Sequence, residues 1–295
     1  MVTRNKMGQV VLNIIFILLT IAAVAPFLLL ISSSLSSEAG LAEYGYCFWP
    51  RDFSLNAYTY LMRSGTKIIK GYGITIFVTL TGTVLSVLMT VLFAYPLSRK
   101  ELPGRYACSF FVFFTMLFNG GLVPTYMMWT QVFHIKNTIA ALLVPGLLMN
   151  AFYVIMMRSF FTANIPDALV EAARIDGGGE YTILWKVVMP LSKPMLATLA
   201  LMTGLGYWND WMNSMYYVTD ENLYSIQAIL NTIITNIQFL TSGQTSISGN
   251  VDMSKLPSVS IRMAIAVVGV LPVLCIYPFF QKYFVKGIVV GGVKG

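Results

Sequence analysis

The chain has 295 residues, of which 57% are hydrophobic and only 11% are charged, and its formal net charge is +7. Because about a quarter of the residues of soluble domains are charged, this composition excludes an ordinary soluble domain and favours a protein that crosses a membrane several times. The three cysteines, Cys47, Cys108 and Cys275, cannot form a disulfide framework, and the two in apolar runs are interpreted as small apolar side chains rather than metal ligands.

Six apolar segments predict an all-α fold, a polytopic membrane protein with about six transmembrane helices that forms one domain over residues 1–295. Each segment is long enough to cross about 30 Å of hydrocarbon as a helix. They cover residues 10–31, 73–95, 107–132, 138–161, 195–218 and 261–283. The first follows Arg4 and Lys6 but is too long for a cleaved signal sequence, so we expect an uncleaved helix.

The third segment is interrupted by polar residues and helix breakers. Such breaks are tolerated at membrane depth where the chain packs against protein or lines a cavity. They are Asn119, Gly120, Gly121 and Pro124. We therefore expect a broken span here.

The distribution of cations indicates the orientation. With the amino terminus in the cytoplasm, twelve of the 19 Lys and Arg residues lie inside and seven outside. Since cytoplasmic loops of membrane proteins carry an excess of these residues, we expect both termini to be cytoplasmic. Arg63, Lys67 and Lys70, before the second span, oppose this orientation. The positive charge is then mainly topological and gives no reason to expect nucleic-acid binding.

Two longer connections, residues 32–72 and 219–260, lie outside in this topology. In the second, apolar residues recur at steps of three and four with polar residues between them, which predicts an amphipathic helix. They are Leu223, Ile226, Leu230, Ile233, Ile237 and Leu240. This helix is too polar to span, so we expect it on the outer membrane surface or against the helix bundle. The polar stretch "TSGQTSISGN" that follows suits a loop that contacts a partner.

Motifs for catalysis, metal binding and nucleotide binding are missing from the sequence. It has no G-x-x-x-x-G-K-[ST] phosphate loop, so we do not expect this chain to hydrolyse ATP. The single histidine, His134, is interpreted as a surface residue, and no carboxylate pair, Ser/His/Asp set or Cys/His cluster indicates a site. We therefore expect no catalytic residue, no metal and no cofactor on this chain.

The one acidic residue within the predicted spans is Asp210, in "YWNDWMNSMYY". An aspartate at the bilayer centre costs about 2.5–3.5 kcal/mol on insertion scales, so it needs a reason. Two interpretations stay open: Asp210 lies at the wetted outer end of its helix, or it belongs to a polar path where aromatic faces and amides suit a sugar. The path candidates are Tyr207, Trp208, Asn209, Asp210, Trp211 and Asn213, together with Asn119 and Asn150, which could instead form helix–helix hydrogen bonds.

A polar loop, residues 162–194, faces the cytoplasm in this topology. Its sequence predicts a short helix that begins near Pro166 and ends at the glycines 177–179. A second helix over residues 180–188 should stop near Pro190. Alanines give the first helix a small-residue face that another surface can approach closely: Ala168, Ala172 and Ala173. An ordinary amphipathic linker is the alternative.

The loop resembles the EAA motif of ABC importer permeases, in which EAA is followed after three residues by Gly and after nine more by I-x-L-P. The matching residues, with Val and Met for the usual Ile and Leu, are Glu171, Ala172, Ala173, Gly177, Val187, Met189 and Pro190. Further segments resemble permeases of the carbohydrate uptake class, above all the maltose-type subgroup that imports oligosaccharides and polysaccharide fragments. They are "FSLNAY", "NGGLVPTYM", "NDWMNSMYYV", "KLPSVSIRMA" and the ending "YPFFQKYFVKGIVVGGVKG".

This resemblance implies a type I ABC importer permease in a bacterial plasma (inner) membrane. A second permease subunit, expected to form a heterodimer with this chain, would complete the path, and two copies of a cytoplasmic ATPase would bind ATP and Mg. An external binding protein would deliver the carbohydrate and contact the loop 219–260. The coupling loop 162–194 would dock on the ATPase through Glu171, Ala172, Ala173, Arg174, Asp176, Gly177 and Pro190.

Two other functions remain open at this point. An ABC permease for another solute, such as a polyamine or phosphate, shares the EAA motif. An ion-coupled secondary carrier belongs to a different class, but it normally shows several ionisable groups within its spans or repeated broken helices, and here only Asp210 qualifies.

Overall fold

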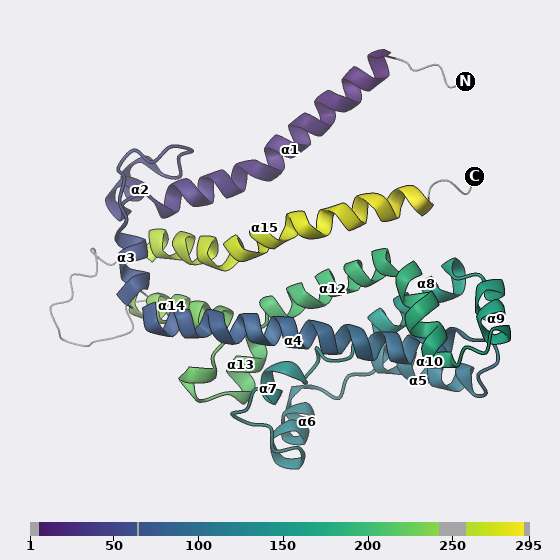
Figure 1. The fold of residues 1–295 in the computed structure, drawn as a ribbon. Coiled ribbons are helices and arrows are strands. Elements are labelled where there is room, and N and C mark those ends of the chain that lie inside the picture. Colours follow the sequence, from purple (N-terminus) through teal and green to yellow (C-terminus); the bar gives the residue numbers. More distant parts are fainter. Residues whose placement is uncertain (1–5, 64, 242–257, 292–295) are drawn as a thin grey trace. The chain divides into compact units, whose positions relative to one another are not determined.

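The computed structural model describes residues 6–63, 65–241 and 258–291 (Figure 1). The secondary structure of these residues is helical, apart from one isolated bridge between Ser36 and Phe53, which confirms the predicted all-α class. The chain divides into two compact units, one of Met1–Ile68 and Leu230–Pro272, the other of Ile69–Ile229 and Val273–Gly295.

The helices of the described residues differ widely in length. In chain order they are α1 (Lys6–Ser34), α2 (Glu38–Tyr44), α3 (Asn56–Arg63), α4 (Gly65–Ser98), α5 (Arg105–Leu117), α6 (Leu122–Met127), η1 (Met128–Val132), α7 (Ala140–Leu143), α8 (Ala151–Asn164), α9 (Asp167–Ile175), α10 (Glu180–Ile183), η2 (Leu184–Val188), α11 (Met189–Leu191), α12 (Lys193–Trp208), α13 (Met212–Tyr217), η3 (Glu221–Leu223), α14 (Ile226–Thr241) and α15 (Ser258–Gly291).

Three helices of the described residues are long and apolar enough to cross a membrane. These helical stretches are Met7–Ser34, Gly65–Ser98 and Val259–Phe279. Two bent pairs raise the number to five if each pair is one span: Arg105–Leu117 with Leu122–Val132, bent by 115°, and Glu180–Leu191 with Lys193–Trp208, bent by 84°. The predicted number of six spans is therefore not confirmed.

The fourth predicted span, residues 138–161, accounts for the difference. It folds as α7 and α8 with irregular chain between them, where Gly146 has φ +73°. The 14 residues of α8 extend about 21 Å, less than the roughly 30 Å of a hydrocarbon core.

The third predicted span is broken where its sequence predicts. α5 ends at Leu117 and α6 begins at Leu122, after Gly121 with φ +84°. The Asn119 side chain accepts a hydrogen bond from the Gly121 N–H at 2.9 Å, so the polar residue stabilises the turn that separates the two helices.

In the first unit, a carboxylate holds the beginning of α15. Glu38 in α2 accepts hydrogen bonds from the Val259 N–H at 2.9 Å and from the Ser260 N–H and hydroxyl at 3.1 Å. These backbone groups have no partner within their own helix, so the contact ties α2 to the first turn of α15.

In the second unit, small residues let other elements approach α4 closely. Gly82 lies against the Tyr207 ring of α12, and Gly71 lies against Ile226 and Ile229 at the beginning of α14. The Ile226 N–H also donates to the Thr75 hydroxyl at 2.8 Å. α14 covers the segment for which the sequence predicts an amphipathic helix, and its first turn packs against α4. The predicted contact loop after it lies mostly in residues 242–257, outside the described residues.

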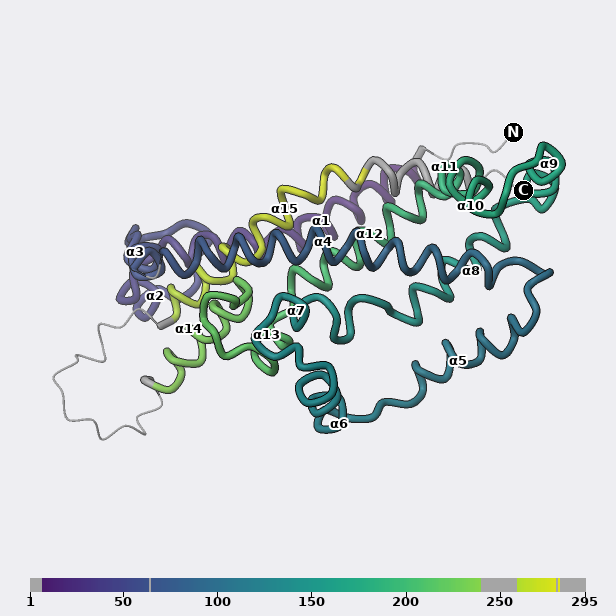
Figure 2. The backbone as a smooth tube through the Cα atoms, turned by 60° about the horizontal axis from the view of Figure 1, so that its bottom comes forward, coloured from purple at the N-terminus to yellow at the C-terminus, as the bar shows by residue number. Residues whose placement is uncertain are grey.

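The end of α4 that leads into α5 packs against a buried apolar cluster. Figures 1 and 2 both show α8, α9 and α10 gathered there. One buried apolar cluster joins the elements, with members such as Ala94 of α4, Met157 of α8, Val170 of α9 and Val188 of η2. This cluster positions the loop 162–194 on the body of the unit.

Candidate functional site

The loop 162–194 begins with α9, which ends in a tight glycine turn. The Gly177 N–H donates to Arg174 O at 3.0 Å and the Gly178 N–H donates to Ala173 O at 2.9 Å, the two bonds of a Schellman motif. Gly177 has φ +81°, a left-handed conformation that strongly favours glycine. The predicted helix end at the glycines is thus confirmed.

The second half of the loop is helical for longer than the sequence predicts. α10, η2 and α11 follow one another to Leu191, one residue past Pro190. The chain then bends by 84° into α12. At the bend the buried Ser192 hydroxyl donates to Val188 O at 2.8 Å, and Pro194 lies in the first turn of α12, where its missing N–H costs nothing.

α9 has one face on the buried cluster and one face in solvent. Val170 is buried and Ala173 is half-buried, and both pack against the apolar cluster. The exposed face carries Ala168, Glu171, Ala172 and Ile175. Of the residues that the EAA resemblance assigns to docking, Glu171, Ala172, Arg174, Asp176, Gly177 and Pro190 are exposed in the single chain, whereas Ala173 faces inward.

Two large apolar side chains on this surface do not belong to the motif. Ile175 ends α9 and is 86% exposed, and Tyr181 is in the first turn of α10 and is 77% exposed. They lie on the two sides of the glycine turn, outside the residues of the EAA pattern.

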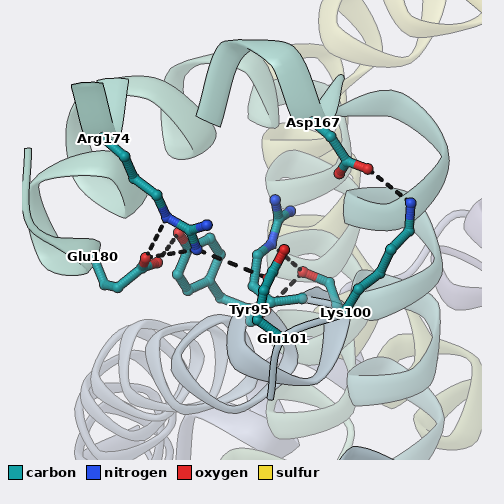
Figure 3. Close-up of polar contacts among 8 residues, drawn as sticks. Tyr95, Lys100, Glu101, Asp167, Arg174 and Glu180 are labelled. Atoms are coloured by element: carbon teal, nitrogen blue, oxygen red, sulfur yellow. Dashed lines mark hydrogen bonds and ion pairs between the residues drawn. The ribbon is translucent and has the colours of Figure 1, made fainter. Parts of the chain in front are cut away.

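A carboxylate connects the loop to α4 (Figure 3). Glu180 accepts a hydrogen bond from the Tyr95 hydroxyl at 2.7 Å and bonds from the Arg174 guanidinium at 2.9 and 2.8 Å. Arg174 also lies 3.9 Å from the Glu101 carboxylate. One acidic side chain therefore joins the C-terminal end of α4 to α9 and α10.

A second ion pair joins the same elements. Lys100 Nζ lies 2.9 Å from Asp167 Oδ2. The hydrogen bond from Lys100 lowers the pKa of the Asp167 carboxyl, and the same contact raises the pKa of Lys100. Both side chains are more than half exposed, so the pair adds little stability.

A cavity of about 520 Å³ opens between the end of α4 and the loop. Apolar walls come from Leu92, Pro96 and Leu102, and charged groups from Arg99, Glu101, Arg174 and Glu180. The loop is thus not closely packed along this side, and the polar contacts border the open space.

The predicted path residues divide into buried and exposed groups. Two of the buried residues form hydrogen bonds to the backbone: the Tyr207 hydroxyl donates to Leu143 O at 2.8 Å and the Asn213 amide donates to Pro145 O at 3.0 Å. The buried Trp208 ring lies 6.2 Å from the Tyr72 ring, centroid to centroid, and is tilted by 38° to it. Asn209 is exposed and Trp211 is half-buried. The structure brings together the residues from 207 to 213 at the junction of α12 and α13.

The other two path candidates have local roles. Asn150 caps α8 by accepting from the Phe152 N–H at 2.9 Å, and Asn119 stabilises the turn before α6. Asp210 follows the end of α12, where its side chain accepts from the Asn213 N–H at 3.2 Å in the first turn of α13. Asp210 therefore lies just beyond the end of α12 and is half-buried, and both interpretations of this residue stay open.

A helical chain with apolar helices long enough to cross a membrane defines an integral membrane protein. The chain belongs to the family described as "Binding-protein-dependent transport system inner membrane component", which matches residues 2–290. It is thus a transport subunit of a membrane permease family, which argues against the ion-coupled carrier.

The relatives of this chain include sugar permeases. Protein LplC of Bacillus subtilis (strain 168) is 35% identical over 99% of this chain and 97% of its own length. The polygalacturonan/rhamnogalacturonan transport system permease protein YtcP of the same organism is 36% identical over 99% of this chain and its full length. A solved structure of a bacterial ABC transporter involved in the import of the acidic polysaccharide alginate matches with a TM-score of 0.77 at 30% identity, over 96% of this chain and 99% of that one.

Proposed function

We propose that this chain is the permease subunit of an ATP-driven, binding-protein-dependent importer of acidic oligosaccharides or polysaccharide fragments. The observation that carries the proposal is the coupling loop: an exposed apolar and acidic face on α9 and α10, whose other face is fixed to the membrane helices. In the proposed importer this face docks on the ATPase and passes its motion to the membrane helices, a role that the membership of a binding-protein-dependent transport family supports.

The complete importer would contain this chain, a second permease, two copies of the ATPase and an external binding protein. ATP and Mg bind and react on the ATPase chains, and this chain changes no covalent bond. Both termini are cytoplasmic, so that Ile175 and Tyr181 face the ATPase and residues 219–260 face the binding protein. The membrane is a bacterial plasma membrane.

The acidic substrate is supported by two relatives. Polygalacturonan stands in the name of YtcP and alginate in the description of the solved transporter, and both are acidic polysaccharides.

Reconstitution of the chain with its partner chains in vesicles tests the proposal. A short oligogalacturonate should be taken up only when ATP is present on the side of the membrane that holds the ATPase. A neutral maltodextrin should not compete with it. Collapse of the ion gradients should leave uptake unchanged. ATP-driven uptake of a polyamine or phosphate instead of the sugar would show that the substrate class is wrong.

Glu171→Lys tests the docking role of the loop. Reversal of this exposed charge should lower ATPase retention and uptake by about tenfold or more, because a charged contact at a protein interface is replaced by repulsion. Glu43→Lys makes the same change on the exposed surface of α2 and serves as the control. Equal ATPase retention by both variants would contradict the docking role.

A further inference from the structure

We propose that Glu180 is a positioning residue that fixes the coupling loop to the inner end of α4, so that loop and helix move as one body. This rests on the proposed function and names the device by which motion of the ATPase reaches a membrane helix. We call the three residues Tyr95, Arg174 and Glu180 the inner latch.

The first argument is the geometry of the carboxylate. Both Glu180 oxygens are used: Oε2 by the Tyr95 hydroxyl at 2.7 Å and Oε1 by Arg174 at 2.8 and 2.9 Å. Tyr95 belongs to α4, Arg174 to the last turn of α9, and Glu180 begins α10. One side chain thus fixes the distance between three segments, including two that are 85 residues apart in sequence.

The second argument is that Tyr95 is a rigid donor. It is 5% exposed, its ring packs edge-on against Phe161 with centroids 6.2 Å apart, and the Arg99 guanidinium lies 5.2 Å from its centroid. A hydroxyl held in this way keeps its direction, whereas the Glu180 and Arg174 side chains remain partly exposed. The fixed half of the latch is on the membrane helix and the adjustable half is on the loop.

The third argument is that the apolar contacts of the loop do not fix its direction. Val170, Ile183 and Leu184 hold the loop by apolar burial, which is favourable but has no direction. On the side of the latch the cavity of about 520 Å³ leaves the loop without close packing. Directed hydrogen bonds, those of the latch together with the exposed Lys100–Asp167 pair, therefore add a fixed direction to the position that the apolar cluster gives the loop.

The charged groups that line the cavity balance one another without an external ion. They are two cations, Arg99 and Arg174, and two carboxylates, Glu101 and Glu180. This balance favours an internal connection over a binding site for an anion or a metal.

Two conservative variants break the latch. Tyr95→Phe removes one hydroxyl and leaves the packed ring, and Glu180→Gln removes the charge and leaves the shape. The control Tyr106→Phe removes a hydroxyl from a tyrosine of α5 that is 73% exposed. In the reconstituted importer, both latch variants should keep ATPase bound and hydrolysing, while oligogalacturonate taken up per ATP hydrolysed falls about tenfold, as expected for loss of a bond to a charged group. Tyr106→Phe should keep the wild-type ratio.

The ratio of uptake to hydrolysis separates a positioning role from a merely structural one. A residue needed only for folding would lower assembly, hydrolysis and uptake together and leave the ratio unchanged, and that result would overturn the proposal. The double variant should be no worse than the poorer single variant, because both break one connection.

Hydrogen exchange on the purified chain in detergent tests the contact without any partner. Peptides within residues 168–184 should exchange about tenfold faster in both latch variants than in the wild-type chain or in Tyr106→Phe. Unchanged exchange would overturn the latch. If the wild-type importer takes up no sugar while exchange changes as expected, the proposed function fails and the contact stands.

Discussion

Gly82 shows how one missing side chain sets the distance between two helices. A Cβ atom built on Gly82 would lie 2.4–2.7 Å from carbon atoms of the Tyr207 ring. The ring has no room to retreat, because Tyr207 is buried and its hydroxyl is bonded to Leu143 O. The approach of α4 to α12 therefore depends on glycine at this position.

We expect Gly82→Ala to lower stability by about 1–3 kcal/mol, the usual cost of overpacking. The unfolding temperature of the purified chain in detergent measures this. Gly73→Ala on the same helix is the matched control, because nothing lies within 4 Å of its new methyl group. An equal effect of the two substitutions would show that helix packing at Gly82 is not limiting.

Individual residues also show what the sequence alone can predict. The turn at Gly177 is readable from three glycines that follow a helical pattern, because only glycine adopts its conformation easily. The partnership of Tyr95 with Glu180 is not readable, since 85 residues separate them and their contact depends on how α4 and the loop pack. Local conformation is encoded locally, and contacts between distant residues are not.

At the scale of elements, helix ends depend on partners from other segments. The broken third span is predicted from Asn119, Gly120, Gly121 and Pro124, which act on their own backbone. Residues 138–161 are mostly apolar, so their pattern predicts one helix, but Gly146 and the chain before Asn150 divide it. The carboxylate that holds the first turn of α15 comes from Glu38 of α2, which no local pattern indicates.

We expect Glu38→Gln to loosen the beginning of α15. Loss of the charge at a helix amino terminus should cost about 0.5–2 kcal/mol, because the amide is a weaker acceptor and has no favourable interaction with the helix dipole. Hydrogen exchange of the amides from 259 to 262 should become faster.

The control for this substitution is Glu43→Gln, which makes the same chemical change at an exposed residue of α2. Exchange of the α15 amides should stay at the wild-type rate in that variant. Similar exchange rates in the two variants would argue against Glu38 as the cap.

At the scale of the whole molecule, function depends on which loops face which compartment. The proposed orientation puts Trp49 outside and Ile175 in the cytoplasm. Both side chains are more than 80% exposed in the single chain, at 82% and 86%, so a cysteine at either position is within reach of a reagent.

Cysteine labelling of the complete chain tests this orientation. In a background with Cys47, Cys108 and Cys275 replaced by alanine, Trp49→Cys should react with a membrane-impermeant maleimide on intact cells. Ile175→Cys should react only after the membrane is permeabilised. Reaction of both cysteines on intact cells, or of neither, would contradict the orientation.

The second half of the loop and α12 are two helical segments that meet at the 84° bend beside Ser192, so a rotation about this point would move the far ends of both. Helix α12 has 16 residues and is about 24 Å long, so a rotation of about 10° at Ser192 would move its far end by about 4 Å. That far end is Trp208, beside Asn209, Asp210 and Asn213. In the proposed orientation, a small tilt of the loop on the cytoplasmic side would thus move the polar residues at the far end of α12 by about the width of a water molecule or more, because of the length of the helix alone.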